Sequence, residues 1–295
     1  MIKRENLKDL YPLSPMQEGM LYQCLLDPDD TTYHQQVVYT LQGEMTPDYV
    51  ELAWRNLVSR HEMLRTVFVT EKVKRPLQAV LHESPNGFHY QDLSLEDQPN
   101  LEDAIEAEQG HGFDLQAGPL MRLTLLKSGE AAYTLIWSHH HILMDGWCVS
   151  ILLNEFTALY EGYRNADVVD LPSPPLFSRY IKWLEQQDHG TAKSYWHTAL
   201  ESQKRLCQIP QQDSDHASDA QERTRQAELH REIPRHLCSE LDQQAQNWRI
   251  TTGSLLQACW AILLSKYNNE DDVVFGTLIS GRPSDLEGAM EMLGL

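Results

Sequence analysis

A strand that ends in three histidines and passes directly into a long apolar helix places the strongest constraint on how this chain folds. Residues 131–141, AAYTLIWSHHH, read as a buried strand, and residues 118–128 form a second strand that is joined to it at Gly129. Residues 146–163, GWCVSILLNEFTALYEGY, have the apolar spacing of a helix. A hairpin followed at once by a helix predicts layers of helix and sheet.

The remainder of the chain alternates irregularly between helical and strand patterns and contains no internal repeat. Helices are predicted at 13–26, 46–64, 177–200 with a break at Gly190, 234–248 and 251–267, with a solvated acidic helix within 91–110. Further strands are predicted at 33–43, 64–71, 76–82, 227–233 and 272–281. The polar stretch 211–226 is expected to be mobile.

Three local signals refine these elements. Ser14 followed by Gln17 predicts a capping box at the start of the first helix. In the second helix, Thr46 is the predicted cap, and Val50, Leu52, Ala53 and Leu57 are expected to face inward. The helix over 251–267 is apolar on nearly every side, which predicts a buried position.

The proline-rich segment LPSPP at 171–175 is the clearest linker in the chain. It predicts an N-terminal lobe over 1–170 and a second lobe over 171–295. The fold class is therefore an α/β sandwich with mixed sheets in two lobes.

Composition excludes several classes of protein. The formal charge is −19, from 24 basic and 43 acidic residues, and no basic cluster offers a nucleic-acid footprint. No segment reaches the roughly 18 apolar residues of a membrane span, and residues 1–10 lack a signal-peptide core. Five scattered cysteines predict reduced thiols and a cytoplasmic location. Neither a G-x-G-x-x-G turn nor a P-loop is present.

The histidine triplet allows three interpretations. As metal ligands, His139 and His141 would share one face of the strand and could join Asp145, but no further Cys/His pair with ligand spacing follows, so no metal is predicted. As structural residues, His139 and His140 could be buried and satisfied at the end of the strand. As a proton-transfer group, His141 would lie at the turn before the helix that Gly146 opens.

The turn after His141 has features that suit catalysis. The free N–H groups at the start of the following helix could bind an oxyanion. Gly146 permits a tight turn and leaves space for a substrate. Asp145 could orient the imidazole, or it could pair with a distant arginine and hold the turn.

These residues and their surroundings resemble the condensation domains of nonribosomal peptide synthetases. HHILMDG at 140–146 matches the HHxxxDG motif, LSPMQEGML at 13–21 resembles the first family motif, and RHEMLRTVF at 60–68 the second. Three more segments follow in family order: FDLQAGPLMR at 113–122, FSRYIKWL at 177–184 and DDVVFGTLISGRP at 271–283. HxxxD alone is a weak signal, whereas six ordered motifs are a specific one.

The resemblance implies a chloramphenicol-acetyltransferase-like fold with a tunnel between two lobes. Donor and acceptor peptidyl carrier domains would bring phosphopantetheine thioesters to the tunnel, an adenylation domain would be adjacent, and the domain itself would bind no cofactor. The acceptor amine would attack the donor thioester to form an amide bond. Family members continue beyond GAMEMLGL, so the second lobe is expected to be incomplete.

The resemblance also assigns residues. His141 would orient or deprotonate the amine, with His140 beside it in the catalytic motif, and Gly146 would lie by the reacting carbonyl. Asp145 would be a structural aspartate paired with Arg65. The floor of the tunnel would include Ser280, Gly281 and Arg282.

Three alternatives remain open. An epimerisation domain shares the fold and HHxxxDG, although the first two motifs favour condensation. A free-standing acyltransferase that uses coenzyme A is a nearer relative. The chain could also be a fragment that binds carrier domains without completing catalysis.

Overall fold

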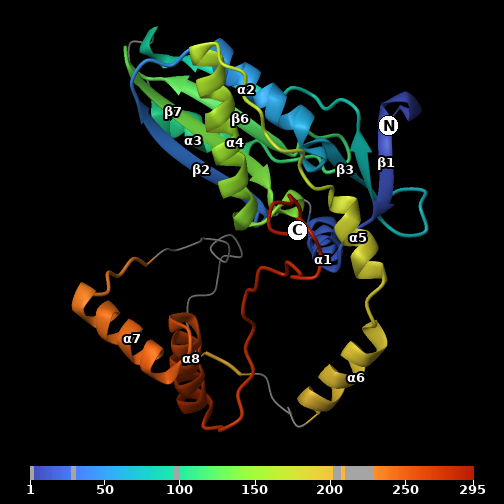
Figure 1. Cartoon of the computed structure of the whole chain (residues 1–295), viewed down its shortest axis with the longest axis vertical. Coiled ribbons are helices and arrows are strands. Elements are labelled where there is room, and N and C mark those ends of the chain that lie inside the picture. Colours follow the sequence, from blue (N-terminus) through green and yellow to red (C-terminus); the bar gives the residue numbers. More distant parts are fainter. Residues whose placement is uncertain (1–2, 28–30, 96–99, 202–206, 210–228) are drawn as a thin grey trace, which may run out of the picture. The chain divides into compact units, whose positions relative to one another are not determined.

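The computed structural model describes residues 3–27, 31–95, 100–201, 207–209 and 229–295 (Figure 1). Contacts divide the chain into two compact units, Met1–Gln187 with Ser280–Leu295, and Asp188–Ile279. The first unit extends past the boundary predicted at residue 170, because Phe177, Ile181, Met292 and Leu293 are buried in its core. The assignment of lobes over 1–170 and 171–295 stays a prediction.

Two sheets form the frame of the first unit. The four-stranded sheet has the order β2-β7-β6-β5 and is mixed, because β5 is parallel to β6 whereas the other pairs are antiparallel. The three-stranded sheet has the order β1-β4-β3 and is antiparallel. The strands are β1 (Leu7–Pro12), β2 (His34–Gln42), β3 (Thr66–Val69), β4 (Leu77–Leu81), β5 (Phe88–Asp92), β6 (Met121–Lys127) and β7 (Ala132–His140).

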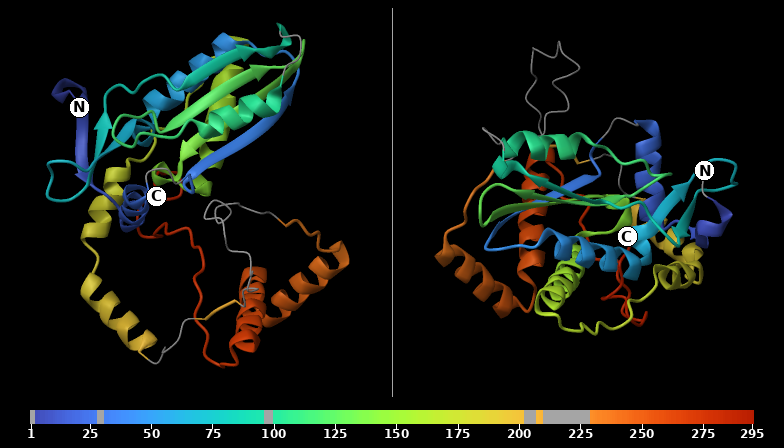
Figure 2. Two further views of the ribbon diagram at one scale, coloured as in Figure 1. Left: turned by 180° about the vertical axis from the view of Figure 1, so that it is seen from behind. Right: turned by 90° about the horizontal axis from the view of Figure 1, so that it is seen from above.

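Helices cover both faces of the four-stranded sheet (Figure 2). Those of the first unit are α1 (Pro15–Leu26), α2 (Pro47–Arg60), α3 (Leu101–Gly110), α4 (Gly146–Asn165) and α5 (Phe177–Glu185). Four 3₁₀ turns accompany them: η1 (Arg4–Asn6), η2 (Glu62–Arg65), η3 (Leu93–Leu95) and η4 (His141–Leu143). Trp54 of α2 and Phe156 of α4 pack on Trp137, whereas Ile105 of α3 packs on the cluster that contains Ile136. Adjacent residues of β7 thus serve opposite layers.

Local signals set the helix ends of the first unit. The Ser14 side chain accepts from the Gln17 backbone N–H, and the Gln17 side chain accepts from the Ser14 N–H, so the predicted capping box is confirmed. Thr46 precedes α2 as predicted but makes no side-chain cap hydrogen bond. Val50 and Leu57 are buried, but the expectation for Leu52 is wrong, since it is 43% exposed.

The second unit contains α6 (His189–Leu200), α7 (Arg235–Trp248) and α8 (Thr252–Asn268). The predicted break in the helix over 177–200 lies just before Gly190, between the end of α5 at Glu185 and the start of α6 at His189. Asp188 caps α6, because its carboxylate accepts the Gly190 and Thr191 N–H groups. The buried position predicted for α8 is wrong: Leu255 and Leu264 are buried, but other apolar side chains of the helix are exposed.

Two predicted strands are absent from the described part of the chain. Residues 229–233 and 272–281 carry no strand pairing, and a strand needs a hydrogen-bonded neighbour to persist. The ends of the first prediction, 227–228, and the segment 211–226 lie outside the described residues. Among the described helices, none is both long enough and apolar enough to cross a membrane.

Candidate active site

The histidine triplet lies where β7 passes through η4 into α4, within the first unit. Strand β7 is central, with β2 on one side and β6 on the other, so its last residues are fixed by two ladders. His140 pairs with His34, and His139 pairs with both Gln35 and Met121. The backbone N–H of His141 donates to the Tyr33 carbonyl at 2.8 Å, which anchors the start of the turn.

His140 is a buried, neutral residue. Its Nδ1 accepts from the Ile142 backbone N–H at 3.1 Å, so the proton of the neutral ring lies on Nε2. Nε2 is 3.5 Å from the Cys24 sulfur. Burial, followed by the neighbouring His34, lowers the pKa of His140 to about 3. The ring therefore shapes the turn and carries no charge near neutral pH.

His139 is also buried and faces the opposite side of β7. Burial, followed by His141, lowers its pKa to about 4. Its Nδ1 is buried and has no hydrogen-bond partner among the described residues. Its burial matches the structural role left open for it, but the expectation that the ring would be satisfied is not met at Nδ1.

His141 differs from both neighbours because it is only half-buried. Its Nδ1 is enclosed, and within the described ranges neither ring nitrogen has a hydrogen-bond partner. A polar ring with no protein partner at the end of a central strand is available to bind or exchange a proton with a substrate.

Gly146 opens α4 and is exposed. A Cβ built on this residue meets no atom within 4 Å, so open space lies against the backbone at the start of the helix. The first N–H groups of a helix have no partner within the helix. Open space thus lies beside the first N–H groups of α4, of which that of Cys148 is taken by Asp145.

Asp145 caps α4 and pairs with Arg282. Its Oδ1 accepts from the Cys148 backbone N–H at 3.2 Å and lies 3.1 Å from Arg282 Nη2. The predicted pairing of Asp145 with Arg65 is therefore wrong. Burial, followed by the Asp145 charge, raises the pKa of Cys148 to about 11, which keeps that thiol protonated beside the pair.

Arg65 has a different set of partners. Its guanidinium donates to the carbonyls of Val58 and Ser59 at the end of α2, and to those of Leu81 and His82 at the end of β4. Burial lowers its pKa. Because four carbonyls surround the group, Arg65 joins α2 to β4 and reaches no carboxylate at the turn.

Arg282 holds residues 280–295 against the start of α4. Its Nη1 donates to the Ala289 and Met292 carbonyls at 2.6 Å each, while Nη2 reaches Asp145. The Trp147 indole donates to the Met290 carbonyl at 2.8 Å. Arg282, one of the three predicted tunnel residues, therefore lies at the turn between His141 and the start of α4.

The other two predicted tunnel residues, Ser280 and Gly281, are exposed. Gly281 has a φ of 62°, a left-handed conformation that favours glycine. Their role in a tunnel stays a prediction.

Gln17 is a site residue that the sequence did not reveal as one. Its amide donates to the Ile142 carbonyl at 3.1 Å and accepts from Gln78 Nε2 at 2.9 Å. Both glutamines are fully buried. Gln17 therefore links α1 to the turn after His141, in addition to its capping role, which was the only signal the sequence offered.

Arg60, His61 and Glu155 form a second missed cluster, which joins α2 to α4. Glu155 Oε2 lies 2.8 Å from Arg60 Nε and 2.7 Å from His61 Nε2. Burial alone would raise the pKa of Glu155, but the hydrogen bonds from His61 and Arg60 lower it. The cluster fixes the helix that carries Asp145 and Gly146.

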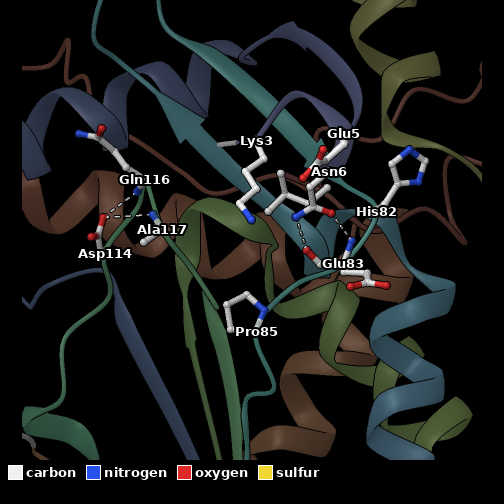
Figure 3. A pocket seen from close by; sticks show the side chains of 10 residues that line it. Lys3, Glu5, Asn6, His82, Glu83, Pro85, Asp114, Gln116 and Ala117 are labelled. Atoms are coloured by element: carbon white, nitrogen blue, oxygen red, sulfur yellow. Dashed lines mark hydrogen bonds between the residues drawn. The ribbon is translucent and has the colours of Figure 1, made fainter. Parts of the chain in front are cut away.

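The described residues of the first unit enclose at least two cavities. The larger, of about 910 Å³, is lined by η1, by the segment after β4 and by the loop at Asp114, and it includes no predicted site residue (Figure 3). The smaller, of about 180 Å³, includes His140. Among the described side chains, no three His, Cys, Asp or Glu residues gather as a metal would require, and the absence of a bound metal stays a prediction.

Comparison with known sequences addresses the family. The sequence pattern of the condensation domain matches residues 7–295. The chain belongs to the condensation-domain family. It is 38% identical to plipastatin synthase of Bacillus subtilis over 100% of its own length, and 36% identical to tyrocidine synthase 2 of Brevibacillus parabrevis over 99%. It spans 8% of the length of each of these relatives.

Comparison with solved structures addresses the fold. The first condensation domain of the CDA synthetase matches with a TM-score of 0.75 and 18% identity, over 97% of this chain and 68% of that one. The condensation domain of the Monacolin K polyketide synthase MokA matches with a TM-score of 0.78 and 18% identity, over 98% of this chain and 66% of that one. The predicted α/β fold with mixed sheets is confirmed.

Proposed function

We propose that this condensation domain joins a donor acyl or peptidyl thioester to the amine of an acceptor aminoacyl thioester. The amine nitrogen attacks the thioester carbonyl and the C–N bond forms. The C–S bond breaks to release the sulfur of the donor carrier's arm as a thiolate, and the proton lost by the amine ends on that sulfur. The observation that carries this proposal is His141, whose half-buried ring has no hydrogen-bond partner in the described part of the chain. It lies beside a helix start that faces open space at Gly146.

His141 is the residue that we place on the amine, to orient it or to accept its proton. The carbonyl oxygen of the thioester would lie at the start of α4, where free N–H groups can stabilise a developing negative charge. His140 and Asp145 would be positioning residues. His140 is neutral and holds the turn, and Asp145 fixes the start of α4 through its pair with Arg282.

Both thioesters would be carried by phosphopantetheine arms on donor and acceptor carrier domains, next to an adenylation domain. The family match and the plipastatin and tyrocidine synthases among the relatives support this assignment. We also infer a cytoplasmic location, since five scattered cysteines without a paired spacing are typical of reduced thiols.

The test is amide formation from a pair of loaded carrier domains. His141→Ala should reduce the single-turnover rate by about 10²–10⁴-fold, the usual contribution of a positioned acid–base group, with little change in the free energy of unfolding. The matched control is His89→Ala, an exposed histidine on β5, which should keep the wild-type rate. Product at the wild-type rate from His141→Ala would reject the assignment.

A further inference from the structure

Ile142, the residue that follows His141 in η4, is held on both sides by side chains. Its N–H donates to His140 Nδ1 at 3.1 Å, and its carbonyl accepts from Gln17 Nε2 at 3.1 Å. Ile142 is fully buried, so both of its backbone polar groups need partners within the protein. The first bond is local, since His140 is two residues away. The second comes from α1, 125 residues earlier in the chain.

The Gln17 amide is used completely. Its Oε1 accepts from the Ser14 N–H at 3.0 Å and from Gln78 Nε2 at 2.9 Å. Its Nε2 donates to the Ile142 carbonyl and, at 3.4 Å, to Gln78 Oε1. A primary amide has two donors and two acceptor sites, so the group has no capacity left for a further partner. Because the Ser14 N–H can only donate and the Ile142 carbonyl can only accept, these neighbours determine the orientation of the amide.

Gln78 connects this amide to the three-stranded sheet. It lies on β4, and its Nε2 also donates to the Pro12 carbonyl of β1 at 2.9 Å. Gln17 and Gln78 are both 0% exposed, so water cannot replace either group, and a partner left unpaired would bear the full cost of its desolvation. The carbonyl of the residue after His141 is therefore fixed to a sheet through two buried side chains.

The capping of α1 does not account for the whole Gln17 side chain. A capping box needs only an acceptor oxygen at this position, and a glutamate supplies it as well as a glutamine. The cap uses Oε1, which accepts from Ser14, whereas Nε2 faces Ile142 and takes no part in the cap. A requirement for an amide at position 17 thus comes from the turn at η4.

We propose that Gln17 is a positioning residue for amide formation, which holds the Ile142 carbonyl and thereby fixes the His141 ring. The proposal rests on the proposed function, because His141 is the residue that we place on the amine. The His141 ring has no hydrogen-bond partner among the described residues, so its position depends on the backbone that carries it. A misplacement of about 1 Å in a reacting geometry can reduce a rate by about 10²-fold.

The first measurement needs no substrate. Histidine side chains are labelled with ¹³C, and the NMR signal of His141 is identified by its loss in His141→Ala. In Gln17→Leu this signal should shift and broaden, because the Ile142 carbonyl loses its partner and the turn becomes freer to move. Gln23→Leu is the matched control, since Gln23 is exposed on the same helix, and it should leave the signal unchanged.

Ser14→Ala is a second control, which weakens α1 without altering the Gln17 amide. It removes the hydroxyl that caps the helix and donates to the Leu295 carbonyl, while the backbone N–H of residue 14 still donates to Gln17. Ser14→Ala should therefore lower the Tm and leave the His141 signal as it is. Equal changes of that signal in Ser14→Ala and Gln17→Leu would overturn the proposal, because weakening of α1 would then explain both.

The second measurement is single-turnover amide formation with loaded carrier domains. In Gln17→Leu the rate constant at saturating carrier should fall about 10²-fold, since the catalytic group is misplaced. The carrier concentration that gives the half-maximal rate should not change, because Gln17 is fully buried and cannot touch a carrier. Gln23→Leu and Ser14→Ala should keep the wild-type rate constant.

Gln17→Glu tests the N–H group alone and replaces Gln17→Leu if that variant does not fold. The new carboxyl keeps an acceptor for Ser14, but when ionised it places an oxygen against the Ile142 carbonyl and Gln78 Oε1. When protonated it has the shape of the amide and donates to Ile142. Burial raises the pKa of such a group, and buried glutamates with pKa values of about 8–9 are known.

The rate constant of Gln17→Glu, divided by that of wild type at the same pH, should therefore rise as the pH is lowered from about 8.5 to about 6. Titrating groups that both proteins share cancel in this ratio. For Gln23→Glu the ratio should stay near one. If the ratio for Gln17→Glu is also near one throughout, or falls with the pH, the amide does not position His141.

The two measurements separate this proposal from the proposed function. A change of the His141 signal in Gln17→Leu, without amide formation by wild type, would reject the proposed function and with it the catalytic role of Gln17, and would leave a structural contact. Amide formation by wild type with an equal rate constant in folded Gln17→Leu would reject the positioning role and leave the proposed function intact.

Discussion

Removing the Asp145 carboxylate should destabilise the start of α4 and loosen residues 280–295. The Asp145 and Arg282 side chains are 23% and 9% exposed and lie 3.1 Å apart. Asp145→Ala removes a helix cap, worth about 1 kcal/mol, and leaves a mostly buried guanidinium without its carboxylate. Breaking a fully buried pair costs about 3–5 kcal/mol. Because Arg282 keeps two carbonyl partners and Asp145 is partly exposed, we expect a total loss of about 3 kcal/mol.

The cap and the charge can be measured separately. Asp145→Asn keeps an oxygen that accepts the Cys148 N–H and should therefore cost about 1 kcal/mol less than Asp145→Ala. Arg282→Ala should also release the Ala289 and Met292 carbonyls. The double mutant should lose less than the sum of the single losses, by about 1–2 kcal/mol, because the two side chains share one interaction.

The assay is urea unfolding followed by circular dichroism and by tryptophan fluorescence. Trp147 is a local reporter, since its indole donates to the Met290 carbonyl in the anchored segment. As a control, Asp145→Ala combined with Arg65→Ala should be additive within about 0.5 kcal/mol, since these residues share no partner among the described residues. Additive losses for Asp145 and Arg282, with coupling between Asp145 and Arg65, would refute the assignment.

Three further predictions test other parts of the first unit. The free energy of unfolding should fall as pH is lowered from about 6 to about 4, because the unfolded chain protonates its histidines near pH 6.5, while the folded pKa values of His139 and His140 are about 4 and about 3. Each of the two histidines contributes about 1.4 kcal/mol per pH unit to this slope. Urea titrations of His139→Gln at several pH values should lack the share of His139. Arg65→Lys keeps the charge but cannot reach four carbonyls, so it should lower the free energy of unfolding by more than about 1 kcal/mol, and a loss within error of zero would mean that the clamp is dispensable. Gly146→Ala should leave that free energy within about 0.5 kcal/mol, since the new methyl group meets no atom, yet reduce amide formation by filling the space beside the substrate carbonyl; full activity would show that no substrate atom lies there.

The sequence predicted those features of the first unit that depend on neighbours along the chain. The capping box of Ser14 and Gln17 is a contact over three residues, and the structure has it. The ladder between β6 and β7 follows from a hairpin at Gly129 and a buried apolar run. Such features need only local geometry and the burial of one face.

Partners that are distant in sequence could not be predicted in the same way. Asp145 and Arg282 are far apart along the chain, and only the return of residues 280–295 to the first unit brings them together. Arg65 was an equally basic candidate, but its guanidinium is enclosed by the ends of α2 and β4. Charge and motif order alone could not distinguish the two arginines.

Strands were hardest to predict where their partners are distant or lacking. β5, with the sequence FHYQD, is short and pairs in parallel with β6, and nothing in its own residues indicates this partner. Residues 272–281 have the composition of a strand but find no ladder among the described residues. β-propensity describes how well a residue fits a half-buried pleated surface, so it does not produce a strand where no neighbouring strand is available to pair.

The histidine triplet shows how strand geometry gives three identical side chains different surroundings. Because successive residues of β7 face opposite layers, His139 and His140 are buried on different sides and remain neutral. Their low pKa values reduce stability as the pH falls, because protonation then favours the unfolded chain. His141 is the first residue beyond the strand, so its ring is only half-buried, while its backbone is still fixed by Tyr33. A histidine one position earlier would be buried and neutral, and one several positions later would lie on α4, where no strand ladder would hold its backbone in place.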